Sequence, residues 1–314
     1  MRLSVAHPRR HANLRRIERL DPAVDFDEIL HLVAYHEFPW EYVQGTSIAF
    51  MRDYGVPSIS DLLDRTRRFE HEGQKRYDDT VLIGYEAVVD GVDSRRAHAA
   101  IRHLNGIHGH YGIPNHEFRY VLATTLVGPK RFIDRYGYRA LHPHEVEAMT
   151  RVTTRFGELM GIKDLPATYA DYEQLLDDYE AEHFAPGPAN TRVAEASIRI
   201  VTGWYPGPLR PAVRRVTIAM LDEPLRVALG LPRQPAWLVR SVNSLVRLRG
   251  RALRLLPPRP ADKPYRHDPH RTYPFGYSLA DLGPRDHSTE RHRDAPERAP
   301  EDVPETIAQQ KDAS

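Results

Sequence analysis

Cysteine is absent from all 314 residues of this chain. Its absence excludes thiolate-ligated haem, covalently attached c-type haem, cysteine-ligated iron–sulfur clusters, cysteine nucleophiles and disulfides. The chain is therefore compatible with a reducing compartment, and at this length it can bury a core that needs no covalent cross-link.

An excess of charge of either sign is also missing. Lys and Arg number 44 and Asp and Glu number 43, which gives a formal net charge of +1. Nucleic-acid-binding proteins usually carry a strong positive field, so we expect no nucleic-acid partner.

Long hydrophobic runs are lacking as well. Stretches free of Asp, Glu, Lys and Arg, such as 42–51, 120–129 and 200–209, are well short of the roughly 20 residues that span a bilayer. The first residues are basic and have neither the apolar stretch nor the small-residue cleavage site of a secretory signal. We expect a cytoplasmic protein, and we expect any membrane contact to be peripheral, at the inner face.

The pattern from about residue 25 to 185 is helical. Apolar residues return there at steps of three and four, and alternating β-type runs are few. Capping boxes at 58–61 and 168–171 predict two helix starts, and Asn115 is placed to cap a helix that Pro129 should kink or end. The predicted fold is all-α, with a single large helical domain.

Composition divides the chain into three parts. Residues 1–24 form a basic N-terminal extension, residues 25–284 the helical domain, and residues 285–314 a charged tail without aromatics that we expect to be disordered. Aromatic residues in 264–283 should anchor an extended C-terminal strap to the body.

Residues 231–260 contain seven arginines and no acidic residue, with apolar residues interleaved. This is a cationic amphipathic segment. Either a helix docks its apolar stripe on the body and leaves the arginines in water, or the segment contacts anionic lipid at a membrane surface.

The segment 94–111 is the first candidate for chemistry. If it is helical from Ser94, its apolar stripe ends in His108, whose imidazole then points inward. A neutral inward imidazole ligates iron or zinc well, although such a histidine is also a common hydrogen-bonded core residue. Arg102 and Asn105 lie on an adjacent stripe, where the arginine could neutralise a carboxylate such as a haem propionate.

The segment 75–80 is the second candidate. Asp79 or Thr80 can cap a following helix while Arg76 pairs with Asp78, or Arg76 faces the cavity. Thr125 can bond the backbone one turn back or offer its hydroxyl to a ligand. The sequence has no H-E-x-x-H zinc motif, dinucleotide-binding glycine motif, P-loop or nucleophile elbow.

At these segments the chain resembles the MpaB/rubber oxygenase family, which includes the fungal MpaB oxygenases and the bacterial latex-clearing proteins. The matching segments follow one another over about residues 37 to 284. They are FPW (38–40), GVPSI (55–59), KRYDDT (75–80), IRHLNGIHGHYGIPN (101–115), RYVLATTLVGPKRFIDRYG (119–137), ELMGIKDLP (158–166) and YPFGYSLADLGP (273–284).

The resemblance implies an all-α catalytic domain and a non-covalently held haem b. It further implies that the haem and dioxygen oxidise a lipophilic, isoprenoid-like substrate, with cleavage of a carbon–carbon double bond. His108 is then the expected iron ligand, Arg102 and Arg76 are expected at the cofactor, and Thr125, Asn105 and His110 are the candidates for assisting proton transfer.

Alternatives remain at this point. The latex-clearing branch resembles this chain but carries a histidine in the helix that here reads 120–124, so either His108 is the ligand or haem binding is altered. Peroxidase-like or monooxygenase chemistry, and non-enzymatic lipid binding at a membrane surface, are the rival functions.

Overall fold

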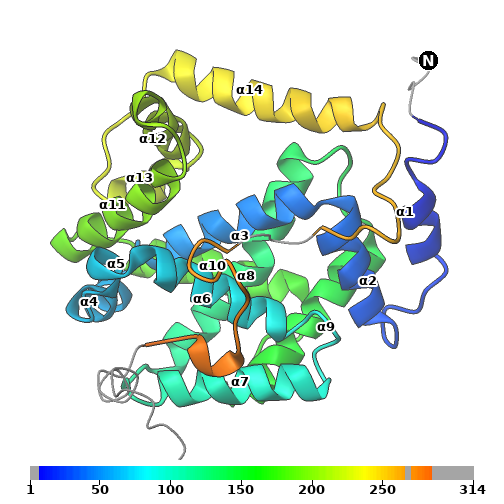
Figure 1. Cartoon of the computed structure of the whole chain (residues 1–314), viewed down its shortest axis with the longest axis horizontal. Helices are drawn as coiled ribbons and strands as arrows, with labels where there is room; N and C mark the ends of the chain where they lie inside the picture. The colour runs from blue at the N-terminus through cyan, green and yellow to red at the C-terminus, as the bar shows by residue number, and fades with distance from the viewer. Residues whose placement is uncertain (1–6, 266–269, 285–314) are drawn as a thin grey trace, which may run out of the picture.

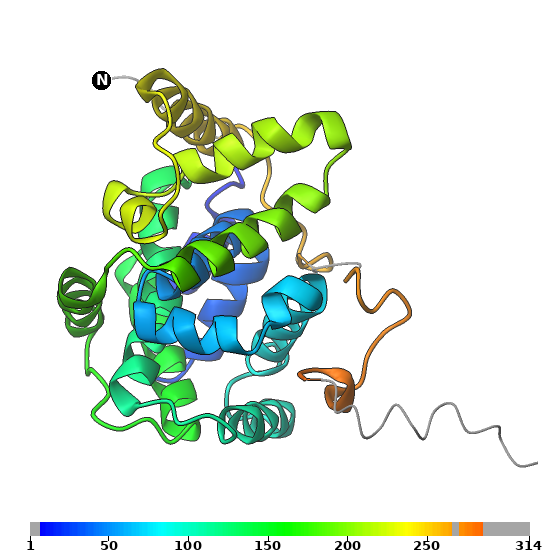
Figure 2. The ribbon, with the colours of Figure 1, turned by 90° about the vertical axis from the view of Figure 1, so that its left-hand side faces the viewer.

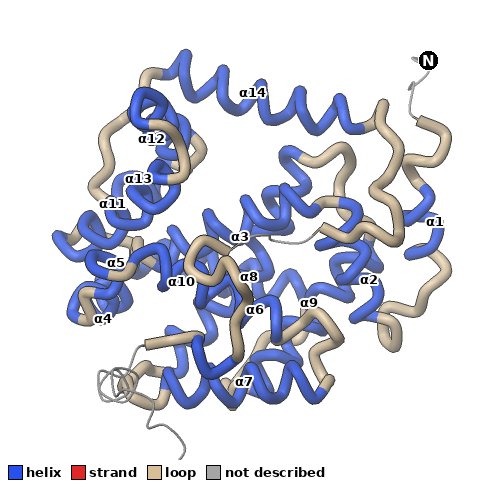
Figure 3. The backbone as a smooth tube through the Cα atoms, viewed as in Figure 1, coloured by secondary structure: helices blue, strands red, loops and turns tan. Residues whose placement is uncertain are grey.

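The structure is a computed structural model that describes residues 7–265 and 270–284. Every regular element in these residues is a helix, and Figure 3 shows no strand among them. The predicted all-α fold is therefore confirmed. The tail predicted at 285–314 lies outside the described residues.

The α-helices are numbered in chain order, and two 3-10 turns and one π-helical turn accompany them. Their bounds are α1 Ala12–Ile17, α2 Phe26–Leu32, η1 Val33–Glu37, α3 Pro39–Asp53, α4 Pro57–Arg65, α5 Arg68–His71, α6 Gly73–Glu86, α7 Arg95–His108, α8 Asn115–Tyr136, α9 Pro143–Leu159, α10 Tyr169–His183, α11 Pro188–Gly203, η2 Gly207–Leu209, α12 Arg210–Ala219, α13 Glu223–Ala228, α14 Ala236–Leu253 and η3 Leu279–Asp281.

The longest helix, α8, lies at the centre and packs along α3 (Figure 1). Small residues allow this close approach, because a side chain at Gly45 of α3 would meet the backbone of Pro129, and one at Gly128 would meet Ala49. Pro129 is buried inside α8, which continues to Tyr136. The expectation that Pro129 ends the helix is wrong, since tertiary packing holds the helix beyond it.

Two apolar cores join the helices. The larger one gathers buried residues of α2, α8, α9 and α10. The second joins the C-terminal end of α3 to α11, α12 and α13, which turn back over the body in Figure 2. The chain thus folds into a helical body with an arm formed by α11 to α14.

The helix starts agree in part with the predicted caps. The hydroxyl of Ser94 accepts from the amide of Ala97 at the start of α7, and the box at 168–171 caps α10. At α4 the cap residue is Val56, which has no capping side chain, and Asn115 is the first residue of α8, where its side chain bonds the backbone of Lys163 instead.

The predicted strap is present. Residues 272–283 run along α6 and end against α7, as the orange segment of Figure 1 shows. Side-chain hydrogen bonds hold the strap on α6: Thr272 donates to Asp78, and Tyr277 donates to Glu86.

No helix in the described part of the chain is both long and apolar enough to cross a membrane.

Candidate functional site

His108 is the last residue of α7 and lies against Phe118 of α8, with 5.4 Å between the ring centroids. Its Nδ1 is buried and has no hydrogen-bond partner in the described residues. Burial first, and then the charge of Arg76, lower the pKa of His108 to about 4. The imidazole is therefore neutral at pH 7, with a ring nitrogen that no protein group satisfies.

Arg76 comes from the neighbouring helix α6. Its guanidinium donates to Thr80 Oγ1 at 3.0 Å and lies 5.8 Å from the ring centre of Phe69 on α5. The structure thus brings Arg76 within electrostatic range of His108. The expected pair of Arg76 with Asp78 is wrong, because Asp78 accepts from the strap residue Thr272 and from Gln74.

The segment 75–80 also does not precede a helix. Asp79 and Thr80 lie inside α6, which begins at Gly73, so neither caps a helix start. Asp79 accepts from Lys75 instead, and Thr80 bonds the Arg76 backbone. The prediction failed because α6 starts earlier than its apolar residues do.

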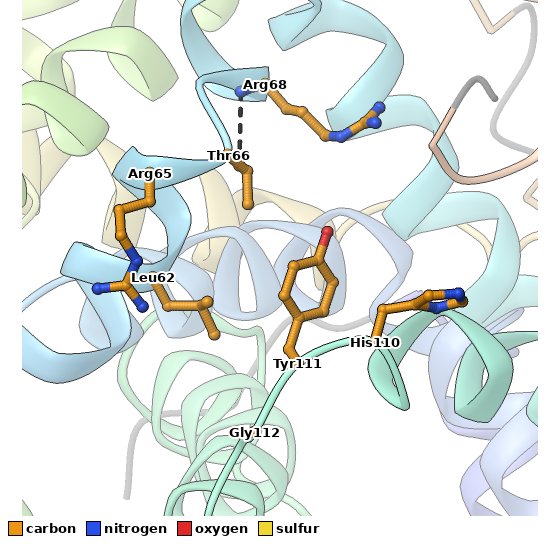
Figure 4. Close-up of a pocket in the computed structure, with 7 residues that line it drawn as sticks. All are labelled: Leu62, Arg65, Thr66, Arg68, His110, Tyr111 and Gly112. Atoms are coloured by element: carbon orange, nitrogen blue, oxygen red, sulfur yellow. Dashed lines mark hydrogen bonds between the residues drawn. The ribbon is translucent and has the colours of Figure 1, made fainter. Parts of the chain in front are cut away.

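A hollow of about 490 Å³ opens between the turn that joins α4 to α5 and the loop that follows α7 (Figure 4). Its volume is in the range of small-molecule sites. Figure 4 shows Tyr111 rising from that loop toward Thr66, beside His110. Arg65 and Arg68 add two guanidinium groups to the lining, and Arg68 is paired with Glu72 at 3.1 Å, so Arg65 is the cation there that best suits an anionic group such as a carboxylate.

The remaining predicted site residues are placed more widely. His110 lines the hollow, is exposed, and bonds the carbonyl of Gly106 at 2.8 Å through Nδ1. Asn105 donates to the carbonyl of Leu159 and so ties α7 to α9. Thr125 donates to the carbonyl of Leu122, and Arg102 is exposed on α7.

A buried polar cluster that the sequence analysis did not single out lies next to Arg76. Lys75 Nζ donates to Asp79 Oδ2 at 2.8 Å, to the hydroxyl of Tyr273 at 2.8 Å, and to the carbonyl of Gly283 at 2.8 Å. His103 of α7 bonds the carbonyl of Leu282 at 2.8 Å. Three of the segments that carry the family resemblance, 75–80, 101–115 and 273–284, therefore meet here.

The cluster residues all lie in segments that match the family, and this common origin is the sequence feature from which the cluster could have been predicted. A lysine and a tyrosine so far apart in the chain give no local pattern, so periodicity alone does not connect them.

The donor set suits a haem better than a bare metal ion. In the described ranges no three His, Asp or Glu side chains gather closely enough to hold a metal. A haem brings its own equatorial nitrogens and needs from the protein an axial imidazole and groups for its propionates. The unsatisfied Nδ1 of His108 and the cations at positions 65, 68 and 76 fit that demand.

A second unsatisfied group lies close by along α8. Arg119 follows Phe118, and its Nε is buried with no hydrogen-bond partner among the residues described. A buried donor without a partner costs roughly 1–3 kcal/mol, so this donor is available to a ligand or to an ordered water.

Comparison with known proteins gives a matching family model and several similar proteins. Residues 54–255 match the family model described as the catalytic domain of ER-bound oxygenase mpaB/B' and rubber oxygenase. An ER-bound oxygenase mpaB' of Penicillium brevicompactum is 31% identical over 249 residues, which cover 73% of this chain and 59% of that protein. An ER-bound oxygenase mpaB of the same fungus is 29% identical over 227 residues, covering 63% of this chain and 58% of that protein. A further mpaB, from Penicillium roqueforti, is 27% identical over 211 residues, or 62% of this chain and 71% of that protein. The chain thus spans about three fifths of the first two relatives.

Proposed function

The chain belongs to the family of MpaB and rubber oxygenases, and on that premise we propose that it is a haem b-dependent oxygenase of a lipophilic, isoprenoid-like substrate. The expected reaction is cleavage of a carbon–carbon double bond with dioxygen. The family membership supports an oxidoreductase that takes a small-molecule substrate and dioxygen. The haem cofactor and the isoprenoid-like substrate are the parts that we propose beyond it.

The observation that carries the proposal is the state of His108. Its side chain is half-buried and neutral at pH 7, and its buried Nδ1 is unpaired in the described structure. A core histidine with a structural role normally has both ring nitrogens bonded or hydrated. An imidazole held neutral and unsatisfied is prepared to ligate a metal, because a ligand nitrogen must carry no proton.

The cations near His108 would hold the rest of the cofactor. Arg76 is fixed by Thr80, and Arg65 and Arg68 line the adjacent hollow. Guanidinium groups bind carboxylates with two parallel hydrogen bonds, so these side chains would bind propionates. Arg102 is the further candidate predicted for this role, from the exposed face of α7.

A bound haem supplies the one-electron and dioxygen chemistry that no side chain of this protein can supply. The protein's own residues would position the substrate and move protons. His110 is an exposed imidazole at the hollow, and its Nδ1 bonds the carbonyl of Gly106, so its Nε2 would be the atom that exchanges a proton with a ligand. The hydroxyl of Thr125 and the amide of Asn105 already bond backbone carbonyls, so they would have to exchange those bonds to assist.

The test is the visible absorption spectrum of the purified full chain supplied with haem, with a pyridine haemochrome assay. We expect a Soret band that His108→Ala abolishes or shifts. His98→Ala is the matched control, because His98 lies on the same helix but is partly exposed and faces Asp93. His98→Ala should leave the band as in the wild type.

Turnover is tested separately with isoprenoid substrates under dioxygen and, in parallel, with peroxide. Oxygen-dependent aldehyde or ketone products support cleavage, whereas peroxide-dependent oxidation would assign the protein to peroxidase-like chemistry. A protein that stays colourless after incubation with haem contradicts the proposal, and a band unchanged in His108→Ala refutes the assigned ligand.

A further inference from the structure

Helix α14 lies at the outer edge of the molecule, where it joins the arm of α11 to α13 to the side of the body that holds α1 (Figure 1). It docks through Val242 and Leu253 and through small and polar residues. Gly250 lies so close to the carbonyl of Tyr136 that a side chain there would collide with it. Asn243 accepts from the hydroxyl of Tyr136, and Arg249 bonds Glu41 at 2.6 Å.

A second set of apolar side chains on α14 faces the other way. Trp237 is 66% exposed, Leu245 64% and Leu248 59%. Trp237 and Leu248 are about three turns apart on one line of the helix. Leu255 and Leu256 directly after the helix are more than half exposed as well. Val242 is buried and Leu253 packs on the main core, as predicted for a helix that docks an apolar stripe. Trp237, Leu255 and Leu256 stay exposed in the described structure and belong to neither contact.

Arginines flank this apolar stripe. Arg240, Arg247 and Arg251 are exposed and recur at steps of seven and four, so they form a row beside Trp237 and Leu248. Within 231–260 there is no Asp or Glu to neutralise them. The outward face of α14 therefore combines an aromatic and aliphatic stripe with a cationic row, while Val242, Asn243 and Gly250 face the protein.

We propose that this outward face of α14 binds an anionic lipid surface. Trp is favoured at the interface between headgroups and acyl chains, leucines insert below it, and arginines reach the phosphates. Each cation near an anionic membrane adds to the attraction, which falls with ionic strength. The proposal does not depend on the haem, although a helix bound to lipid would hold the protein where lipophilic molecules are dissolved.

Charge complementarity selects lipid over a second copy of this chain. Two copies that met through α14 would bring the row of Arg240, Arg247 and Arg251 against an identical row, with no acidic residue of the segment to offset it. Like charges in a buried contact oppose association. An anionic lipid surface matches both parts of the outward face, because its phosphates attract the arginine row and its acyl chains accept the apolar stripe.

The experiment is sedimentation of the full chain with two kinds of vesicle, phosphatidylcholine alone and phosphatidylcholine mixed with phosphatidylglycerol. The wild type should bind the mixed vesicles, bind the neutral ones far more weakly, and be released by salt. Arg240→Gln/Arg247→Gln/Arg251→Gln should lower partition into mixed vesicles about a hundredfold. Trp237→Ser/Leu248→Ser should lower it at least about tenfold, because apolar insertion is lost.

The controls make the same kinds of change away from α14, so that they separate an effect of position from a general loss of charge or hydrophobicity. Arg95→Gln/Arg199→Gln removes two exposed arginines from α7 and α11, and Val24→Ser removes an apolar side chain that is 72% exposed. Both should bind as the wild type does. All changed residues are exposed, so the variants should keep the wild-type circular dichroism.

Three outcomes overturn the proposal. In the first, the wild type does not bind mixed vesicles at low salt, and in the second, the α14 variants bind as tightly as the controls. In the third, size-exclusion chromatography shows a dimer that Trp237→Ser/Leu248→Ser converts to a monomer, which assigns the face to a second copy. Acyl-chain-brominated lipid should quench the wild-type fluorescence, and Trp237→Phe should lose that quenching.

Discussion

Asp53 and His108 are ionisable side chains held away from water, and burial moves their pKa values in opposite directions. Burial favours the neutral form in both cases, so it raises the pKa of the carboxyl group of Asp53 and lowers that of the imidazole of His108. Asp53 ends α3 and accepts from the hydroxyl of Thr124 at 3.1 Å. Its neighbour Arg52 is occupied by Glu180 and Asp222.

Asp53→Asn tests this assignment. The folded protein holds its proton on Asp53 to a higher pH than the unfolded chain does, so the wild type loses stability as the pH rises above the ordinary value of 3.8. Asparagine has no such titration. The variant should gain stability relative to the wild type between pH 5 and pH 8, as urea unfolding at several pH values would show.

Asp64→Asn is the control for that experiment. Asp64 is paired with the exposed Arg192, and that hydrogen bond lowers its pKa. The dependence on pH should therefore have the opposite sign and be small, because an exposed pair is screened by solvent. A stability difference for Asp53→Asn that is constant with pH would contradict the buried neutral carboxyl.

At the scale of elements, close contacts between backbones decide which helices pair. Gly45 and Gly128 let α3 and α8 meet along their length, and Gly250 brings α14 against the C-terminal end of α8. Each of these glycines has an ordinary helical backbone, so what it contributes is the space left by the missing side chain, which lets the two helices approach. The arm of α11 to α14 depends on such a contact at its far end.

Gly250→Ala should loosen α14. A Cβ at this position would lie 2.0 Å from the Tyr136 carbonyl oxygen, so the helix must move, at a cost of about 1–3 kcal/mol. Urea unfolding measures the loss, and limited proteolysis should cut the segment after α14 faster. Gly84→Ala is the control, because Gly84 lies inside α6 with open space around it; the exchange should stabilise by about 0.5–1 kcal/mol. Equal stability of Gly250→Ala and wild type would contradict the close contact.

At the scale of the whole molecule, the strap joins the end of the described chain to its middle. Lys75 is the centre of this connection, because it is 8% exposed and bonds Asp79, Tyr273 and two strap carbonyls. The strap residues Leu282 and Gly283 then contact α7 near His103 and Ile107. The candidate site and the C-terminal segment are therefore parts of one packed unit.

Lys75→Met should release the strap and leave the charge of Asp79 buried without its partner. Removing one member of a buried pair costs about 3–5 kcal/mol. Urea unfolding should show that loss, and proteolysis should cleave the strap early. Lys130→Met is the matched control, since Lys130 and Asp134 have the same spacing but are more exposed, and it should cost less than about 1 kcal/mol. If Lys75→Met and Lys130→Met lower the free energy of unfolding by the same small amount, Lys75 does not hold the strap.

The sequence by itself determined the helical class, the start of α7 at Ser94, the capping box of α10, the strap, and the placement of His108 at the end of an apolar stripe. These features depend on residues a few positions apart, and the 3.6-residue period and capping chemistry act at that range. The family resemblance added the segments that meet around Lys75.

Only the tertiary structure decided the rest. Arg76 bonds Thr80 and not Asp78 because the strap takes Asp78, and Pro129 stays within α8 because α3 packs against it. The two faces of α14 were visible in the sequence, but which face turns inward depends on Gly250 fitting the end of α8. Partners distant in the chain set these outcomes, and a local pattern holds no information about them.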